Sequence, residues 1–90
     1  MKTQKELVEI FKDYDGKNLY DLIEPVDGMV DIFKLDHHNI EIRCDEYIYG
    51  IDYVYALNRN FKNPIYVGYM RFGVCGVTNG IFYATDKVPR

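Results

Sequence analysis

The segment DEYIYGIDYVYALN, residues 45–58, decides the fold because its pattern favours an extended chain. It places four of the nine tyrosines of the protein within nine positions. Between residues 47 and 57, odd positions carry tyrosine, isoleucine or leucine, and even positions carry small or apolar side chains around one carboxylate, Asp52. This alternation is typical of a strand, whose successive side chains point to opposite faces. A helical period also fits Tyr47, Ile51 and Val54, but the β-branched and aromatic content favours a strand.

A helix is predicted near the N-terminus. Thr3 and Glu6 form a capping box, in which each side chain satisfies a backbone N–H at the start of the helix. The apolar residues that follow lie three and four positions apart, on one stripe: Leu7, Ile10, Phe11 and Tyr14. Gly16 can end this helix in the left-handed conformation. A short second helix is predicted to start at Asn18 and to end before Pro25.

The chain after residue 29 is predicted to form antiparallel strands joined by hairpins. Residues 40–45 alternate between apolar and charged, and the polar residues 36–39 separate them from residues 29–35. Asn79 and Gly80 both accept the positive φ of a type I′ turn and predict a tight hairpin. That hairpin would pair Val77 with Phe82, Gly76 with Tyr83 and Cys75 with Ala84. Glycines at positions 68, 73 and 76 suggest bulges or a bend in the strand that starts at residue 65.

These elements predict a single small globular α+β domain, residues 1–90. The N-terminal helix and the short second helix would pack on one face of a four- to five-stranded antiparallel sheet, a meander of hairpins. The protein is 48% hydrophobic and 28% charged, which is ordinary globular usage. No apolar run approaches the ~18 residues of a membrane span, and the N-terminus lacks the apolar core of a signal peptide. We therefore expect a cytoplasmic protein with no membrane partner.

The net charge of −3 is unevenly distributed along the chain. Residues 1–45 carry a balance of −5 and residues 46–90 a balance of +2, counting lysine and arginine against aspartate and glutamate. A protein that binds duplex nucleic acid usually has a far stronger basic surface. The charge pattern therefore argues against duplex DNA or RNA as a partner.

The residues that most often carry chemistry are sparse or badly spaced. Cys44 and Cys75 are the only cysteines, and without a CxxC pair we expect buried thiols rather than a disulfide or a zinc site. His37 and His38 are adjacent and would point in opposite directions in an extended chain, so no metal site is predicted. Residues 13–18 lack the ligand spacing of a calcium loop. There is no serine nucleophile and no phosphate-binding loop, so we predict no catalytic residues and no cofactor.

Asp52 and Arg71 each interrupt an otherwise apolar strand face. A hairpin through residues 58–64 would bring the two residues opposite or diagonal to each other. The first interpretation is a structural ion pair, which would be costly to break from one side. The second is an anion site at the sheet surface.

The tyrosines leave two interpretations open, packing and binding. Two short helices can cover only one face of a sheet, and tyrosine suits the open face because its ring covers neighbours while its hydroxyl stays wet. Tyrosine is also enriched at contact surfaces. We predict a binding surface formed by Tyr47, Tyr49, Tyr53 and Tyr55 with Tyr66 and Tyr69 nearby.

The leading hypothesis is a non-enzymatic protein-interaction module that binds another protein or a second copy of itself. Its size and residue usage also suit a small phage or mobile-element inhibitor of a host protein. The alternative is a small-ligand binder that takes a planar, anionic, nucleotide-like molecule, with Arg59, Lys62 or Arg71 meeting its charge. An enzyme of unknown type is the second alternative. We identify no motif of a known family in the sequence.

Overall fold

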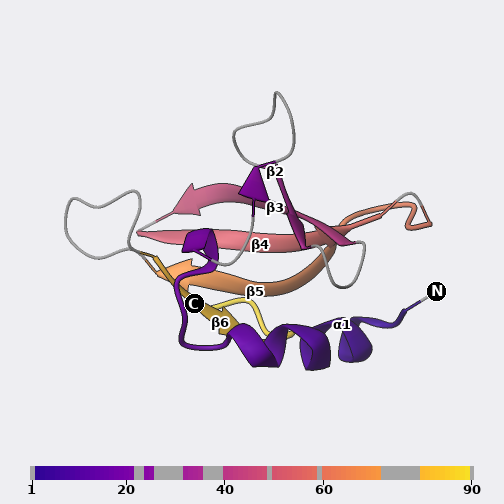
Figure 1. Ribbon diagram of the computed structural model, residues 1–90, viewed down its shortest axis with the longest axis horizontal. Helices are drawn as coiled ribbons and strands as arrows, with labels where there is room; N and C mark the ends of the chain where they lie inside the picture. The colour runs from indigo at the N-terminus through magenta and orange to yellow at the C-terminus, as the bar shows by residue number, and fades with distance from the viewer. Residues whose placement is uncertain are drawn as a thin grey trace.

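A computed structural model describes residues 2–21, 24–25, 32–35, 40–48, 50–58, 60–71 and 80–89 (Figure 1). One α-helix, α1 (Gln4–Phe11), is followed by two 3-10 turns, η1 (Lys12–Tyr14) and η2 (Leu19–Asp21). The strands are β1 (Glu24–Pro25), β2 (Ile32–Leu35), β3 (Ile40–Ile48), β4 (Ile51–Leu57), β5 (Ile65–Arg71) and β6 (Ile81–Ala84). They form one antiparallel sheet in the order β1-β2-β3-β4-β5-β6. The predicted α+β meander is confirmed, with β1 as a sixth strand of only two residues.

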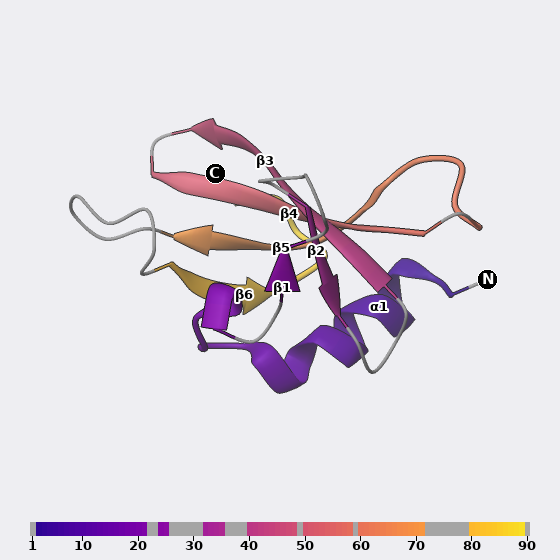
Figure 2. The same ribbon diagram turned by 45° about the horizontal axis from the view of Figure 1, so that its top comes forward.

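The N-terminus of α1 follows the sequence prediction. Thr3 Oγ1 accepts a hydrogen bond from the backbone N–H of Glu6 at 3.2 Å, which is the N-cap half of the predicted capping box. Leu7 and Phe11 are fully buried, whereas Ile10 and Tyr14 pack against the core with part of their surface exposed. Figure 2 shows α1 running along the β5–β6 side of the twisted sheet. No helix within the described residues is long and apolar enough to cross a membrane.

The predicted second helix is not present in the described residues. Only the single turn η2 follows Asn18 there, and Pro25 lies in β1. The backbone before η2 is instead used to pair with the edge of β6. Gly16 N–H donates to Phe82 O at 2.7 Å, and Phe82 N–H donates to Lys17 O at 2.8 Å. Leu22 and Ile23, which the second helix would have buried, lie outside the described residues.

The opening segment is a hairpin rather than one continuous strand. Ile48 pairs with Ile51, so β3 and β4 form a hairpin, and Gly50 lies in a turn directly before β4. Gly50 has φ 77°, a left-handed conformation that glycine adopts at no steric cost. The segment is therefore extended as predicted, but residues 45–48 belong to β3 and residues 51–57 to β4.

A β-bulge interrupts the pairing of β5 with β4. Tyr55 pairs with Tyr66 and Val54 pairs with Gly68, which leaves Val67 without a counterpart in β4. The bulge beside Gly68 agrees with the prediction from that glycine. Because one extra residue reverses the alternation of side chains, Val67 and Gly68 are both buried. The glycines at 73 and 76 lie outside the described residues.

The predicted register between β5 and β6 is wrong. Phe82 pairs with Met70, Tyr83 with Tyr69 and Ala84 with Gly68. The predicted partners Val77, Gly76 and Cys75, and Asn79 of the predicted turn, lie outside the described residues. The packing at Gly68 explains the preference for this register. A Cβ on Gly68 would lie 2.7 Å from the Phe82 ring and would meet the Tyr83 carbonyl oxygen. The Phe82 ring thus covers the strand glycine Gly68.

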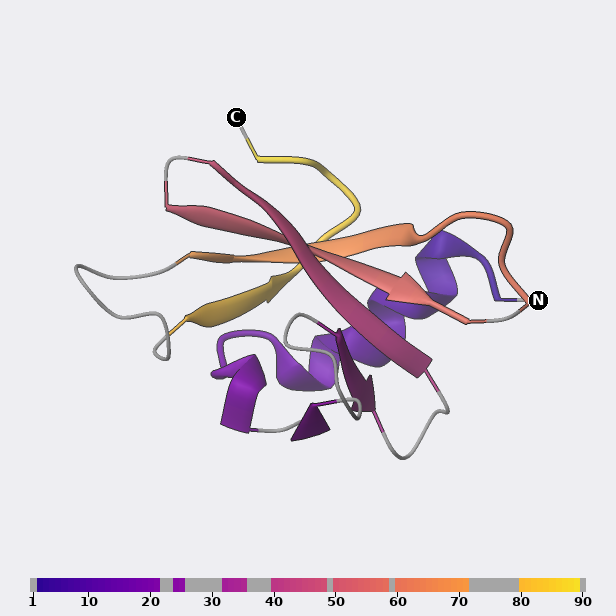
Figure 3. The same cartoon turned by 90° about the horizontal axis from the view of Figure 1, so that it is seen from above.

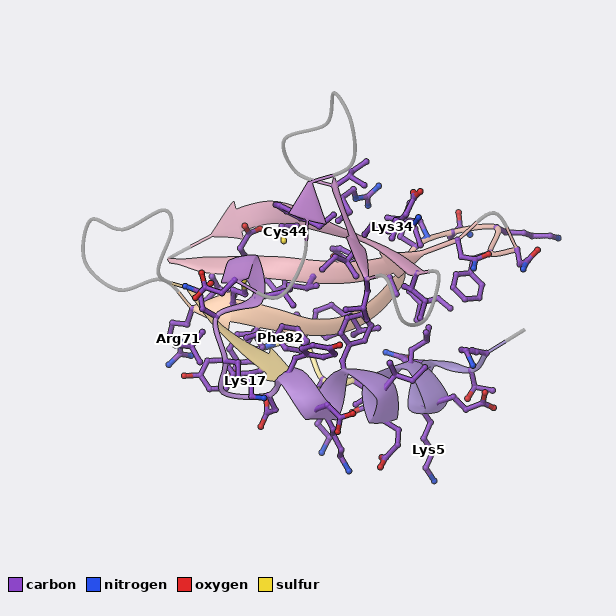
Figure 4. The ribbon with its side chains drawn as sticks, in the orientation of Figure 1. Lys5, Lys17, Lys34, Cys44, Arg71 and Phe82 are labelled. Atoms are coloured by element: carbon purple, nitrogen blue, oxygen red, sulfur yellow. The ribbon has the colours of Figure 1, made fainter. Side chains whose placement is uncertain are left out.

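The core lies between α1 and one face of the sheet. The rings of Phe11 and Phe82 join the two layers with centroids 5.7 Å apart, and Phe82 lies between β6 and the helix in Figure 4. Cys44 is buried on this face, as predicted. The buried residues are Leu7, Phe11, Leu19, Phe33, Leu35, Ile40, Ile42, Cys44, Val54, Ala56, Val67, Met70 and Phe82.

Candidate functional site

The face of the sheet opposite α1 carries five tyrosines, which we call the tyrosine face: Tyr53, Tyr55, Tyr66, Tyr69 and Tyr83. The register explains why they share it. Tyr53 pairs with Tyr69, and Tyr69 pairs with Tyr83, so these three form a row across β4, β5 and β6. Tyr55 pairs with Tyr66 in a second row. Their neighbours in sequence, such as Val54 and Phe82, point into the core.

The rings of the tyrosine face contact one another in two groups. Tyr66 contacts Tyr55 edge-on with centroids 5.8 Å apart and Tyr53 with centroids 6.2 Å apart. Tyr69 and Tyr83 are stacked, with centroids 5.0 Å apart and an interplanar angle of 25°. Edge-to-face and offset-stacked pairs are the arrangements that aromatic rings prefer. The rings therefore hold one another in defined positions on the sheet.

Two arginines lie over these rings. The Arg43 guanidinium carbon is 5.4 Å from the centroid of the Tyr55 ring, and that of Arg71 is 5.9 Å from the centroid of the Tyr69 ring. Arg43 extends the row of Tyr55 and Tyr66 into β3, whereas Arg71 pairs with Ile51 in a third row. A guanidinium over an aromatic face is attracted by the negative potential of the ring.

Tyr66 lies between Tyr53 and Tyr55 and contacts both rings. Burial raises the pKa of its hydroxyl well above the ordinary range, and the neighbouring hydroxyls of Tyr53, Tyr69 and Tyr55 add to the rise. Its hydroxyl donates to the backbone carbonyl oxygen of Lys87 at 3.3 Å. Its own carbonyl, beside the bulge, accepts from Gln4 Nε2 at 3.0 Å.

Part of each ring remains available at the surface. Tyr53, Tyr55, Tyr66 and Tyr69 are half-buried, and Tyr83 is 36% exposed. The core residues on the other face of the same strands, Val54, Met70 and Phe82, have no exposed surface. The two faces of β4, β5 and β6 therefore differ in kind, with a dry aliphatic core on one side and a partly wet aromatic layer on the other.

The structure brings together Tyr53, Tyr55, Tyr66, Tyr69 and Arg71 of the predicted binding residues. Lys62 is separate from them, exposed in the loop between β4 and β5. The side chain of Tyr47, in β3, and residues Tyr49 and Arg59 lie outside what the structure describes.

Sequence reasoning missed Arg43 and Tyr83. Each alternates with buried neighbours in its strand, so its outward direction was visible in the sequence. The ring that each one contacts, Tyr55 for Arg43 and Tyr69 for Tyr83, depends on the register of the sheet.

The predicted ion pair between Asp52 and Arg71 does not form. Asp52 pairs with Met70, a core residue, whereas Arg71 pairs with Ile51, so the two side chains leave the sheet on opposite faces. The bulge at Val67 explains the error, because it moves Tyr69 and Arg71 away from the face occupied by Ile65 and Val67. Arg71 contacts the Tyr69 ring instead.

Other predictions about chemistry fall partly outside the described residues. His37, His38 and Cys75 are among the residues that the structure does not describe. Within the described part of the chain, no group of three or more histidine, cysteine or acidic side chains is placed to hold a metal ion. Comparisons of the chain with protein-family models, with curated proteins and with solved structures find no significant match.

Proposed function

We propose that this protein is a non-enzymatic protein-interaction module whose tyrosine face contacts another protein, with a second copy of the chain as the simplest case. The observation that carries the proposal is the arrangement of five partly exposed tyrosine rings on three adjacent strands, opposite the helix. Tyrosine and arginine are enriched at protein interfaces and dominate their binding energy.

The arginines strengthen this proposal. Arg43 and Arg71 each place a planar cation on a ring of the face, which keeps the guanidinium ordered before any partner arrives. An ordered side chain loses less conformational entropy on binding than a free one. Arg43 and Arg71 offer positive charge beside the rings, and carboxylates on a partner surface can meet it.

A planar anionic ligand is the second candidate, and one contact favours it. The stacked pair of Tyr69 and Tyr83 lies beside Arg71, which offers an aromatic surface next to a positive charge. We favour a protein partner because the rings extend in rows across β4, β5 and β6 rather than around one point. A broad surface suits a macromolecule better than a small molecule.

The test is native mass spectrometry of protein purified from its own cells, combined with sedimentation of the pure chain. The variant Tyr53→Thr with Tyr83→Thr removes two rings of one row while keeping side chains that favour strands. We expect wild type to carry the mass of a second protein subunit and the variant to bind it at least ~30-fold more weakly, since one buried anchor contributes ~2 kcal/mol or more.

The matched control changes the helix side of the molecule. Glu9 of α1 and Lys12 of η1 form an exposed salt bridge of 3.1 Å, and Glu9→Gln with Lys12→Gln should leave association unchanged. Equal association of wild type and the tyrosine variant would refute the proposal. A co-purified small molecule in place of a protein subunit would support the second candidate instead.

A further inference from the structure

The residues that follow β6 already rest on the tyrosine face. The backbone N–H of Thr85 donates to the carbonyl of the bulge residue Val67 at 3.0 Å. The chain then passes to the side of the sheet opposite α1, where Figure 3 shows the C-terminal end. We call residues 85–89 the tail segment.

The tail segment is bound through its main chain. The hydrogen bond from the Tyr66 hydroxyl goes to the backbone carbonyl of Lys87, while the Lys87 side chain is exposed. Inside the segment, the Lys87 N–H donates to Thr85 Oγ1 at 3.1 Å. Asp86 and Val88 are also exposed. The acceptor is a main-chain carbonyl, which every peptide has. Any extended segment that lies over Tyr66 can therefore accept the same hydrogen bond.

The hydrogen bond from the Tyr66 hydroxyl to Lys87 lies where a partner segment could replace the tail segment. Tyr66 contacts both Tyr53 and Tyr55, so whatever accepts its hydroxyl lies over the middle of that ring group. The hydroxyl is protonated at neutral pH, because its pKa lies above the ordinary tyrosine value, so it remains a donor there. A single neutral hydrogen bond adds little net stability, so a competing segment with its own side-chain contacts can replace it.

We propose that the tyrosine face takes its partner as an extended peptide segment, which displaces the tail segment and accepts the Tyr66 hydroxyl on a main-chain carbonyl. This inference rests on the proposed function and adds the form of the partner. The tail segment acts as an intramolecular competitor, with the high effective concentration that a short tether gives.

The probe is a synthetic peptide with the sequence of residues 84–90, ATDKVPR, titrated by NMR into the full-length ¹⁵N-labelled protein. Thr85→Pro removes the N–H that ties the tail segment to Val67 and leaves Tyr66 in place. We expect the Thr85→Pro protein to bind the peptide at least threefold more tightly than wild type, with shift changes on β4 and β5. Adding Tyr66→Phe should cancel this gain, whereas adding Tyr14→Phe on the helix side should not.

A second measurement follows the mobility of the tail segment and uses neither the added peptide nor the Thr85→Pro substitution. In otherwise wild-type protein, Tyr66→Phe should lower the heteronuclear NOE of residues 86–88 to values of a mobile chain, and Tyr14→Phe should leave it unchanged. The inference is overturned if Tyr66→Phe leaves the tail segment ordered, if the peptide does not bind, or if it binds wild type and Thr85→Pro equally. The proposed function is tested separately by the association of the Tyr53→Thr with Tyr83→Thr variant with its protein partner. If that association is weaker than that of wild type, the proposed function stands even where the tail-segment inference fails.

Discussion

Val67 is the residue on which the geometry of the tyrosine face depends. As the bulge residue of β5, it lets Tyr66 and Tyr69 point to the same side although they are three positions apart. In a regular strand, residues at odd spacing point to opposite faces. The carbonyls beside the bulge find other donors, Gln4 for Tyr66 and Thr85 for Val67, so the irregularity leaves both acceptors satisfied.

Gly68→Ala tests the close approach of β5 and β6. The new methyl group would meet the Tyr83 carbonyl oxygen and lie 2.7 Å from the Phe82 ring, so backbone must shift. We expect a loss of about 1–3 kcal/mol in the free energy of unfolding, measured by urea denaturation. Gly16 has φ 78° but nothing within 4 Å of its missing Cβ, so Gly16→Asn, which tolerates that φ, should cost less. A harmless Gly68→Ala would show that β6 does not approach β5 in this way.

Tyr66 should make stability depend on pH in the alkaline range. Its pKa in the folded protein lies above the unfolded value of ~10, so the folded state keeps the proton that the unfolded state releases. The corresponding stability is therefore complete below pH ~10 and decreases as the pH rises above it. We expect Tyr66→Phe to have a flatter dependence of unfolding free energy on pH between ~9 and ~11, from chemical denaturation. Parallel curves for the two proteins would contradict the buried position of this hydroxyl.

At the scale of elements, the sheet is protected at the β6 edge by the turn after η1. Gly16 and Lys17 exchange backbone hydrogen bonds with Phe82, and Asp15 Oδ1 accepts the N–H of Ala84 at 2.8 Å. An open strand edge can pair with other chains, so this cover also limits aggregation. Gly16 has the predicted left-handed conformation, with φ 78°, but it follows the turn η1 rather than the last residue of α1. Asn18, two residues later, bridges to Ile81.

Asp15→Ala should loosen this edge. It removes the acceptor of the Ala84 N–H, and because Asp15 is exposed we expect a loss of only about 1 kcal/mol. Asp15→Asn keeps a carbonyl acceptor and serves as the control. Hydrogen exchange of the Ala84 amide should accelerate in the alanine variant and change less in the asparagine variant. Equal protection in all three proteins would mean that the carboxylate does not hold the edge.

Phe11→Ala tests whether α1 belongs to the core. The Phe11 side chain is fully buried and its ring centroid lies 5.7 Å from that of Phe82. We expect a loss of about 3–5 kcal/mol in unfolding free energy, from lost burial and the remaining cavity. Ile10→Ala, at a partly buried position of the same helix, should cost less. A midpoint of denaturation that hardly moves for Phe11→Ala would show that the helix is peripheral.

The sequence predicted elements well and pairings poorly, for physical reasons. Local signals placed α1, the β2–β3 hairpin and the extended character of residues 51–57, because capping and alternation act over a few residues. The register of β5 with its neighbours depends on the bulge and on Phe82 covering Gly68, which are contacts between distant residues. Four tyrosines of the face were predicted from alternation and proximity, but the contacts of Arg71 and Tyr83 required that register, and the contact of Arg43 required the register of β3 with β4.

On the scale of the whole molecule, the two sides of the sheet differ in composition. The helix side buries an aliphatic and phenylalanine core, and its exposed surface includes five carboxylates: Glu6, Glu9, Asp13, Asp15 and Asp21. The opposite side carries the tyrosine face with Arg43 and Arg71 over its rings. We propose that stability comes mainly from the helix side and that the tyrosine face serves binding.

The unfolding free energy of the variant Tyr53→Thr with Tyr83→Thr tests this division most directly, by urea denaturation against wild type. Both rings lie on the face opposite the core, and Tyr83 is 36% exposed, so we expect a loss of only about 1–2 kcal/mol in total. A loss of ~5 kcal/mol or more, comparable to removing two core side chains, would show that the tyrosines are part of the core and would contradict the account.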